Sequence, residues 1–299
     1  MTGSLKIGII GSGKVGTATA VLLAEAGYEI GFICDQNRDA LERASERVGV
    51  ATKKEVIAVT DPKDSTNEVD LIFITTPDRS IETAARELAR RRAIRPGHIV
   101  VHMSGSLTSD VLSAVRERGA HAASLHPLQS FADFDQAKKN IPGSIFCIEG
   151  DEQALPILKE IVGVLKGREL RIPKEEKPLY HAGAVVASNF LVSLVWVSLL
   201  MYEKVGLDKK AAFHALLPLI GGTLRNIETL GAPEALTGPI VRGDIDTVRN
   251  HLAVIQERFP EFSEFYRIMG RITVELAREN RDVEENALKK ILDLLSSPT

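Results

Sequence analysis

Short runs of aliphatic and β-branched residues alternate with longer helical stretches in the first part of the chain. These runs predict strands at 6–10, 29–34, 71–75, 99–102, 122–125, 144–148 and 169–172, with a weaker strand at 56–60. Strands that alternate in this way with helical segments are typical of a mostly parallel sheet joined by crossover helices. The pattern therefore predicts an α/β fold with a doubly wound sheet.

Helical periodicity fills the intervals between these strands, and glycine follows several of the segments. The predicted helices span 15–26, 38–48, 80–92, 109–118 and 152–165. Gly27, Gly49 and Gly119 each come directly after one of them. A glycine in this place is typical of a helix that ends in the left-handed conformation.

The pattern changes at a charged, proline-bounded segment, 173–178. Beyond it the chain shows only helical periods, broken by glycines. Short polar segments bounded by proline are typical of domain boundaries. We therefore predict two domains: an α/β domain over 1–173 and an all-helical domain over 174–299.

One segment of the second domain, 184–202, is apolar over about the length of a helix that spans a bilayer. It nevertheless contains Ser188, Asn189 and Ser193, and it is the single run of this kind in the sequence. A helix that is apolar on all sides also suits the centre of a helical domain or a dimer interface. We therefore expect a buried helix of a soluble protein, no membrane partner, and a homodimer formed through the helical domain.

Composition narrows the possible functions. Hydrophobic residues make up 44% and charged residues 26% of the 299 residues, which is typical of a soluble globular protein. A net charge of -3 gives no electrostatic reason to expect nucleic acid as a partner. Two cysteines without ligand-spaced partners predict neither a metal site nor a disulfide framework. The N-terminus lacks the pattern of a signal peptide, so we expect a cytoplasmic protein.

A glycine-rich turn joins the first predicted strand to the first predicted helix. Gly11, Gly13 and Gly16 form the pattern G-x-G-x-x-G, in which the first glycine makes a tight turn and the second lets the backbone approach a pyrophosphate. The third lets the helix pack close to the strand. The strand–turn–helix context predicts a Rossmann dinucleotide site, with cofactor contacts from Gly11, Ser12, Gly13, Lys14, Val15 and Gly16.

Residues at two other strand ends extend this cofactor prediction. Asp35 ends the second strand, 19 residues after Gly16, where a carboxylate accepts hydrogen bonds from the adenosine ribose and favours NAD. Arg38 could pair with the 2′-phosphate of NADP, so NAD is only slightly favoured over NADP. At the end of a later strand we also expect the cofactor to contact Thr75, Thr76 and Pro77.

Several of these segments together resemble a known superfamily. The segments are GIIGSGKVG (8–16), TTPD (75–78), HMSGSL (102–107), SLHPLQSFAD (124–133), YHAGAVVASN (180–189) and ALTGPIVRGD (235–244). They are similar to the 6-phosphogluconate and β-hydroxyacid dehydrogenase-like proteins, and most of all to a branch of NAD(P) oxidoreductases that join a Rossmann-like domain to a helical domain of unassigned function. The resemblance implies nicotinamide chemistry, a dimer through the helical domain, and no particular substrate.

The sequence departs from this superfamily in one respect. β-Hydroxyacid dehydrogenases place a catalytic lysine four residues before an asparagine on the first long helix after the Rossmann domain. On the corresponding helix we expect His181, followed by Val185 four residues later, and no lysine before Lys204. The role of that lysine is therefore not transferred to this chain.

Hydride transfer to a carbonyl needs a proton donor at the oxygen and groups that hold the substrate. His181 and His126 compete for the acid role, and the sequence does not choose between them. Ser104 and Asn189 are further candidate catalytic residues. The candidate substrate-binding residues are Arg242, Gln129 and Ser188.

The leading hypothesis is an NAD(P)-dependent oxidoreductase acting on a small carbonyl or hydroxy compound, carboxylate-bearing compounds included, in a cleft between the domains. The missing lysine motivates an alternative: a dinucleotide-binding sensor or regulator without chemistry. A third hypothesis pairs the nicotinamide with a deazaflavin or another redox carrier.

Overall fold

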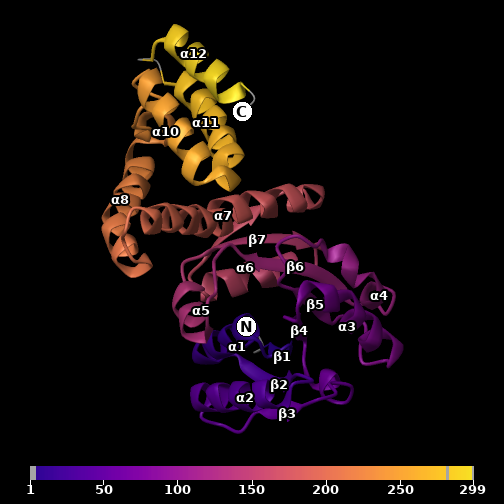
Figure 1. Cartoon of the computed structure of the whole chain (residues 1–299). Helices are drawn as coiled ribbons and strands as arrows, with labels where there is room; N and C mark the ends of the chain where they lie inside the picture. Colours follow the sequence, from indigo (N-terminus) through magenta and orange to yellow (C-terminus); the bar gives the residue numbers. More distant parts are fainter. Residues whose placement is uncertain (1–4, 281–282, 298–299) are drawn as a thin grey trace. The chain divides into compact units, whose positions relative to one another are not determined.

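The computed structural model describes residues 5–280 and 283–297. The chain divides into two compact units, Met1–Leu191 and Val192–Thr299. Unit 1 contains all the strands of the described residues, and the elements of unit 2 are helical throughout its described part. The structure thus confirms the predicted fold class, a mostly parallel α/β sheet followed by a helical region (Figure 1).

The eight strands of unit 1 form one sheet in the order β3-β2-β1-β4-β5-β6-β7-β8. Neighbouring strands are parallel, except that β6 and β7 are antiparallel. The order reverses between β1 and β4, as in doubly wound sheets that bind nucleotides at this place. The strands are β1 Lys6–Ile10, β2 Glu29–Cys34, β3 Ile57–Val59, β4 Leu71–Ile74, β5 Ile99–His102, β6 His121–Pro127, β7 Ile145–Gly150 and β8 Arg168–Arg171.

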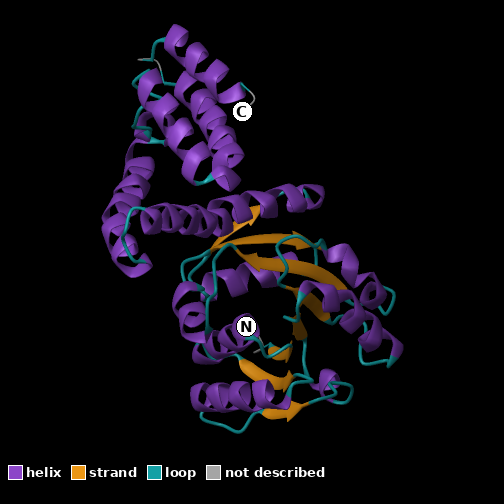
Figure 2. Ribbon diagram, viewed as in Figure 1, coloured by secondary structure: helices purple, strands orange, loops and turns teal. Residues whose placement is uncertain are grey.

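Helices cover both faces of this sheet. Successive strand residues point to opposite faces, so Phe73 packs in one core cluster while Ile72 and Ile74 pack in the other. The first cluster includes residues of α1, α2, α5 and α6, and the second includes residues of α3, η2 and α4 (Figures 1 and 2). The helices of this part are α1 Lys14–Glu25, α2 Arg38–Thr52, η1 Ser65–Glu68, α3 Asp78–Arg90, η2 Ser109–Leu112, α4 Ser113–Arg116, α5 Phe134–Asn140, α6 Leu155–Val164 and η3 Lys174–Glu176.

Three local predictions differ from the structure. The helix α2 continues through Gly49, because Ala51 packs against the core and Lys53, at φ 56°, is the left-handed residue after the helix. The predicted helix 109–118 is a 3₁₀ turn followed by one helical turn. The helix α5 was not predicted, although the Asp133 side chain caps it by accepting a hydrogen bond from the backbone N–H of Gln136.

The division between the units lies inside α7, whereas the sequence pattern placed it at 173–178. The proline-bounded segment forms η3 and the first turn of α7, since Pro178 is tolerated at a helix start. The side chains of Lys177 and Tyr180 then bond to residues of β6. These bonds keep the first turns of α7 with the sheet.

Unit 2 has its own small core. Buried residues of α10, α11 and α12 form it, among them Val248, Val274 and Ile291. The Asp244 side chain caps α10 by accepting from the backbone N–H of Thr247. The helices from α7 onwards are α7 Lys177–Lys204, α8 Lys209–Leu230, α9 Ala232–Ala235, α10 Ile245–Arg258, η4 Pro260–Phe262, α11 Ser263–Arg278 and α12 Glu285–Ser296.

The long helix α7 is not buried within the chain. The segment Lys174–Lys204 is long and apolar enough to cross a membrane, and only 6% of its most apolar window is buried. Phe190 is 54% exposed and Trp196 is 52% exposed. Within the described part of a single chain this helix is therefore mostly uncovered, and the expected burial is not found there, whereas the dimer interface that the sequence also allowed stays a prediction.

Candidate functional site

The glycine turn between β1 and α1 uses each of its glycines differently. Gly11 has φ +103°, and a Cβ there would lie 2.7 Å from backbone atoms of Thr75 and Thr76. A Cβ on Gly16 would collide with the carbonyl oxygen of Gly11. A Cβ on Gly13 would meet nothing within 4 Å. Gly11 and Gly16 therefore shape the turn itself. Gly13 instead leaves the outer side of the turn open to a ligand.

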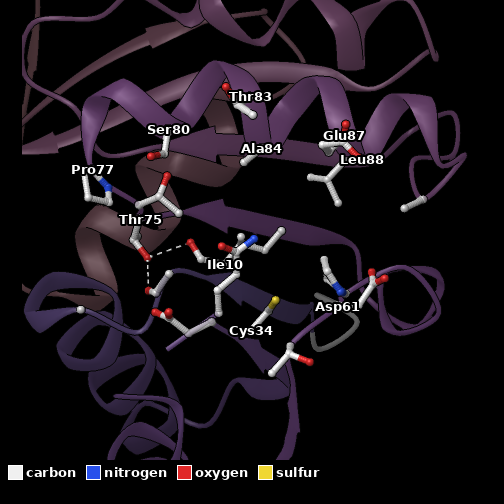
Figure 3. A pocket seen from close by; sticks show the side chains of 18 of the residues that line it. Ile10, Cys34, Asp61, Thr75, Pro77, Ser80, Thr83, Ala84, Glu87 and Leu88 are labelled. Atoms are coloured by element: carbon white, nitrogen blue, oxygen red, sulfur yellow. Dashed lines mark hydrogen bonds between the residues drawn. The ribbon is translucent and has the colours of Figure 1, made fainter. Parts of the chain in front are cut away.

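A cavity of about 990 Å³ opens at this turn, at the carboxyl ends of β1, β2 and β4 (Figure 3). It lies where the strand order reverses, the usual place for ligands in open α/β sheets. The predicted cofactor residues that line it are Gly11, Gly13, Lys14, Val15, Asp35, Thr75, Thr76 and Pro77. Ser12, Gly16 and Arg38 do not line it.

More than half of the cavity lining was not predicted. The segment 60–63, which follows β3, contributes one wall, and one face of α3 contributes another (Figure 3). The α3 residues recur at helical spacing, and that spacing is the signal that could have identified them. The unpredicted residues are Ile10, Cys34, Gln36, Thr60, Asp61, Pro62, Lys63, Ser80, Thr83, Ala84, Glu87, Leu88, Arg91, Ala93 and Phe131.

The residues at the turn fit a pyrophosphate. The cavity reaches Gly13, Lys14 and Val15, at the N-terminus of α1, whose first turn has no acidic residue. Free N–H groups and the helix dipole favour an anion in this position. The hydroxyl oxygen of Thr76, which also lines the cavity, is buried without a hydrogen-bond partner among the described residues. A bound dinucleotide would give this hydroxyl a partner.

Asp35 has a structural task in the turn. Its Oδ2 accepts hydrogen bonds from the backbone N–H and the hydroxyl of Ser12, at 2.7 and 2.9 Å, and its Oδ1 accepts one from the N–H of Asn37 at 2.9 Å. Arg38 is exposed at the start of α2. The contacts of these two residues give no support to the slight preference for NAD.

A second polar cluster lies at the carboxyl ends of β5 and β6. The Ser104 hydroxyl donates to Oδ2 of Asp78 at 2.7 Å and accepts from the N–H groups of Ser106 and Leu107, at 3.2 and 3.1 Å. The N–H of Ser104 donates to Nδ1 of His102 at 3.1 Å. The hydroxyl proposed as catalytic is thus used to shape the loop after β5.

The two candidate histidines come together over Gly105. A Cβ on Gly105 would lie 2.5 Å from Nδ1 of His181 and 2.7 Å from Nε2 of His126. The two rings meet edge to face, with centroids 5.8 Å apart. Nδ1 of His181 is buried and has no hydrogen-bond partner among the described residues. Glycine at position 105 is what allows both imidazoles to approach the loop.

A buried lysine, Lys177, contacts the same loop. Lys177 has no exposed surface, and its ammonium group donates to the Ser124 hydroxyl and, at 3.2 Å, to the carbonyl oxygen of Ser104. Glu149 lies 3.5 Å from it as an ion-pair partner. Burial lowers the pKa of Lys177, and the carboxylate of Glu149 opposes that shift.

The histidines beside Lys177 are held neutral. Burial is the main cause that lowers the pKa of His126 to about 4, and the charge of Lys177 adds to it. The same two causes lower the pKa of His102 to about 4. His102 accepts from the N–H of Ser104, so its Nε2 donates to the carbonyl oxygen of Thr108, at 3.1 Å. His102 is therefore a fixed part of the loop.

The remaining predicted residues lie apart from this cluster or in the other unit. Ser188 and Asn189 are exposed on α7, and helix geometry puts Asn189 about 12 Å along the axis from His181. Gln129 is exposed, and its side-chain oxygen accepts from the N–H of Ser130 at 2.9 Å. Arg242 is exposed in unit 2, in the turn before α10.

The sequence interpretation missed three residues of the cluster: Lys177, Tyr180 and Asp78. It expected no lysine on the long helix before Lys204, and Lys177 as the first residue of α7 corrects that expectation. Pro178 was the available signal, because proline favours the first turn of a helix. The Lys177 position does not match the superfamily lysine, which precedes an asparagine by four residues, since residue 181 is histidine.

Two family models match the chain. Residues 1–127 match the Rossmann-like domain, and residues 144–273 match a domain of unknown function, DUF2520. The N-terminal part of the chain is a Rossmann-like domain. Neither description names the 6-phosphogluconate or β-hydroxyacid dehydrogenases, so that part of the resemblance stays a prediction.

Solved structures extend the similarity over nearly the whole chain. Protein TM1727 from Thermotoga maritima is 28% identical, with a TM-score of 0.71 over 92% of this chain and 99% of that one. BF3122 from Bacteroides fragilis, named as a candidate NADP oxidoreductase, is 23% identical, with a TM-score of 0.68 over 90% and 97%. A reductive aminase from Aspergillus terreus, solved with NADPH and ethyl-5-oxohexanoate, is 14% identical, with a TM-score of 0.62 over 96% and 98%. The last two likenesses show the fold.

One curated relative matches over a shorter stretch. Acetaldehyde dehydrogenase 4 from Azotobacter vinelandii is 36% identical over 101 residues, which are 32% of this chain. The match spans 31% of that protein, about a third of its length.

Proposed function

We propose that this protein is an NAD(P)-dependent oxidoreductase that transfers a hydride between a nicotinamide and a small carbonyl or hydroxy compound. The observation that carries the proposal is the cavity at the glycine turn, with an open Gly13 and an unpartnered Thr76 hydroxyl at the switch point of the sheet. These features suit the pyrophosphate and ribose of a dinucleotide.

The polar cluster supports the chemical half of the proposal. Pro77 lines the cavity, and the next residue, Asp78, accepts the hydrogen bond of Ser104 in the loop that holds the two imidazoles. The cavity and the cluster thus share one edge of the sheet. A bound nicotinamide supplies or accepts the hydride, and an imidazole on this edge can give or take the proton at the substrate oxygen.

The comparisons support the same reaction class. The candidate NADP oxidoreductase BF3122 shares the fold over most of both chains, and so does the reductive aminase solved with NADPH and a keto ester. These names favour a nicotinamide cofactor and a carbonyl-containing substrate for this chain. NADPH and NADH are both to be tested, because Asp35 does not discriminate between them through its observed contacts.

The test of the proposal is consumption of NADPH and of NADH with a panel of small aldehydes, ketones, keto acids and imines. We expect oxidation of at least one reduced cofactor that depends on both substrate and protein. Tight cofactor binding without turnover of any compound, in either direction, would contradict the proposed enzymatic activity and favour the hypothesis of a dinucleotide-binding sensor.

We further propose that a second copy of the chain covers α7 and α8. Large apolar side chains are exposed along both helices, among them Phe190, Trp196, Leu219 and Leu224. Monomeric soluble proteins rarely leave so many large apolar side chains exposed on two long helices. The exposed Ser188 on α7 favours a protein partner over lipid, since polar side chains are costly in a bilayer.

Light scattering of the full chain in aqueous buffer tests this proposal. We expect twice the mass of the chain, and the mass of a single chain for the double variant Phe190→Glu with Leu219→Glu. Val50→Glu is the matched control, because Val50 is 80% exposed on α2 and its change should leave the dimer intact. A monomer in buffer, or a protein that pellets with lipid vesicles, would overturn the proposal.

A further inference from the structure

The cations that line the cavity at the glycine turn differ in their partners. Within the described chain they are Lys14, Lys63 and Arg91. The ammonium group of Lys14 donates to the carbonyl oxygen of Ala132, and the guanidinium group of Arg91 pairs with two carboxylates. The hydrogen bonds of Lys63 within the described residues are made by its backbone, and its ammonium group has no partner there. Lys63 is therefore the cavity cation that is free to bind an anion.

The segment that carries Lys63 lies beside the expected position of the adenosine ribose. In a dinucleotide site this ribose lies at the carboxyl end of the second strand, which here carries Asp35. Both carboxylate oxygens of Asp35 already accept hydrogen bonds. Its backbone N–H donates to the carbonyl oxygen of Val59 at 3.2 Å, because β2 and β3 are paired. The cavity-lining segment 60–63 thus begins next to the residue that faces the ribose.

Two contacts of Asp61 hold the conformation of this segment. Oδ1 of Asp61 accepts from the backbone N–H of Lys63 at 3.1 Å, a turn that aspartate side chains commonly form with the backbone two residues later. Its Oδ2 pairs with the guanidinium group of Arg91, which follows α3, and Nε of Arg91 donates to Glu87 at 3.1 Å. Asp61 therefore connects the loop that carries Lys63 to the wall of the cavity that α3 forms (Figure 3).

Arg38, the cation that the sequence offered for a 2′-phosphate, has a different place. It is the first residue of α2, it is exposed, and it does not line the cavity. Gln36 lines the cavity on that side of the ribose and carries no charge. A guanidinium group matches a phosphate well, but only where it reaches the site. The positive charge that the cavity offers near the ribose is therefore that of Lys63.

From these observations we propose that Lys63 binds the 2′-phosphate of NADPH, and that the chain prefers NADPH to NADH for this reason. The inference rests on the proposed dinucleotide-dependent function and names the cofactor of that site. A phosphate monoester carries a charge of about −1.5 to −2 at pH 7, so an ammonium group beside it forms charge-assisted hydrogen bonds. The unphosphorylated ribose of NADH has no such group. Asp61 and Arg91 are positioning residues that act through the segment 60–63.

The first experiment compares the two cofactors by calorimetric titration of the full chain and of Lys63→Gln. We expect the wild type to bind NADPH about tenfold more tightly than NADH, the usual effect of one charge-assisted hydrogen bond. In Lys63→Gln the two dissociation constants should become similar, because NADPH loses affinity and NADH does not. A wild-type chain that binds NADH as tightly as NADPH would overturn the inference, as would an equal loss for both cofactors in the variant.

Two variants serve as matched controls for the charge and its place. Arg38→Gln removes a cation that also follows β2 but does not line the cavity, and we expect it to keep the wild-type ratio of dissociation constants. Lys63→Arg keeps the positive charge and should keep the preference for NADPH. A preference that is lost in Arg38→Gln and kept in Lys63→Gln would place the 2′-phosphate at α2 and overturn the inference.

The adenosine half of the cofactor tests the same contact without a nicotinamide. Adenosine 2′,5′-bisphosphate contains the 2′-phosphate, and adenosine 5′-monophosphate lacks it. We expect the bisphosphate to bind the wild type more tightly, and the difference to shrink in Lys63→Gln and at high salt, because dissolved ions screen an exposed charge. Equal affinity of the wild type for the two compounds would contradict a 2′-phosphate site in this cavity.

Arg91→Gln tests the positioning residues. The ion pair of Arg91 with Asp61 is exposed, and such pairs contribute little to stability, so the variant should unfold at the wild-type temperature. We expect a smaller preference for NADPH in Arg91→Gln and its recovery in Arg91→Lys, which can pair with Asp61 again. A wild-type preference in Arg91→Gln would contradict the positioning role.

The outcomes separate this inference from the proposed function. If NADPH binds more tightly than NADH through Lys63 and no compound is turned over, the oxidoreductase fails and the 2′-phosphate site remains. If turnover is found and NADH is bound as tightly as NADPH, the oxidoreductase remains and the role of Lys63 fails. Binding of none of these nucleotides would overturn both.

Discussion

The glycine turn and the histidine cluster lie on one edge of one sheet, yet they are built in opposite ways. The turn is made within six consecutive residues, 11–16, with Asp35 and Thr75 holding it from neighbouring strand ends. The cluster joins Gly105, His126 and His181 from three separate segments of the chain. The turn depends on glycines, which have no side chain to fill the space around the backbone. The cluster depends on polar side chains that are buried and hydrogen-bonded.

This difference determines how each region tolerates change. At the turn, the space around the backbone is filled by neighbouring atoms, so the substitution of a glycine by a residue with a side chain is expected to disturb it most. At the cluster, buried charges and hydrogen-bonding groups satisfy one another. Removing a single polar group therefore leaves its partners buried without a hydrogen bond or a counter-charge. Cofactor binding and proton transfer should therefore be separable by mutation.

The largest expected effect is on turnover at the cluster. His181→Ala should lower kcat roughly 10²- to 10⁴-fold, the usual contribution of a general acid or base. The affinity for the dinucleotide should stay the same, because His181 does not line the cavity at the glycine turn. Steady-state kinetics and a cofactor titration on the same preparation check both statements. Normal turnover in this variant would remove His181 from the mechanism.

The next largest effect is on folding at the turn. Gly11→Val places a branched side chain at φ +103° and against the backbone of Thr75 and Thr76, so we expect a loss of about 3–4 kcal/mol in the free energy of unfolding. Urea denaturation followed by circular dichroism measures it. A variant as stable as the wild type would show that the turn adapts to a side chain.

Acidification tests the buried histidines of the sheet. The pKa of His98, His102 and His126 is lowered to about 4 in the folded protein, from an ordinary value near 6.5. The unfolded chain therefore binds more protons below pH 6.5, and the free energy of unfolding falls as the pH decreases from about 6.5 to about 4. We expect a loss on the order of 1 kcal/mol for each histidine between pH 7 and pH 5.

Urea titrations at both pH values measure this loss. His126→Gln should reduce the loss of stability between pH 7 and pH 5, because one histidine with a lowered pKa is removed while His98 and His102 remain. Equal stability at pH 7 and pH 5 would contradict the neutral state of these rings.

The smallest expected effect concerns the choice of cofactor. Asp35→Asn weakens the hydrogen bonds that hold Ser12, so the affinity for NADH and for NADPH should fall together, by about 1 kcal/mol. The ratio of the two dissociation constants is the informative measurement. Tighter binding of NADPH in this variant, with weaker binding of NADH, would restore Asp35 as a residue that selects NAD.

The same contrast explains what the sequence could predict. The strands and the glycine turn follow from local rules of hydrophobic alternation and backbone conformation, and these were confirmed at β1, β2 and β5. The left-handed residue after α2 was assigned to Gly49, because glycine is the usual choice and Lys53 is a rarer one. At α2 the prediction failed because contact with the core extends the helix beyond Gly49.

The cluster could be predicted only in part. His126 and His181 were identified as polar residues at a strand end and at a helix start, and the structure brings them together over Gly105. Lys177 was not identified, because its neighbours in the sequence are charged and read as an exposed linker. Its burial results from Ser124 and Glu149, which are distant in the sequence and supply partners that no local pattern contains.

The central claim is that the cavity at the glycine turn binds a nicotinamide dinucleotide, and calorimetric titration of the full chain with NADPH and NADH tests it most directly. We predict saturable binding of at least one of them, lost in Gly13→Ala, whose added methyl group would occupy the open side of the turn. Gly163→Ala, which also meets nothing within 4 Å but lies on α6 away from the cavity, should bind as the wild type does. Binding of neither dinucleotide by the wild-type chain, or equally tight binding by Gly13→Ala, would contradict the claim.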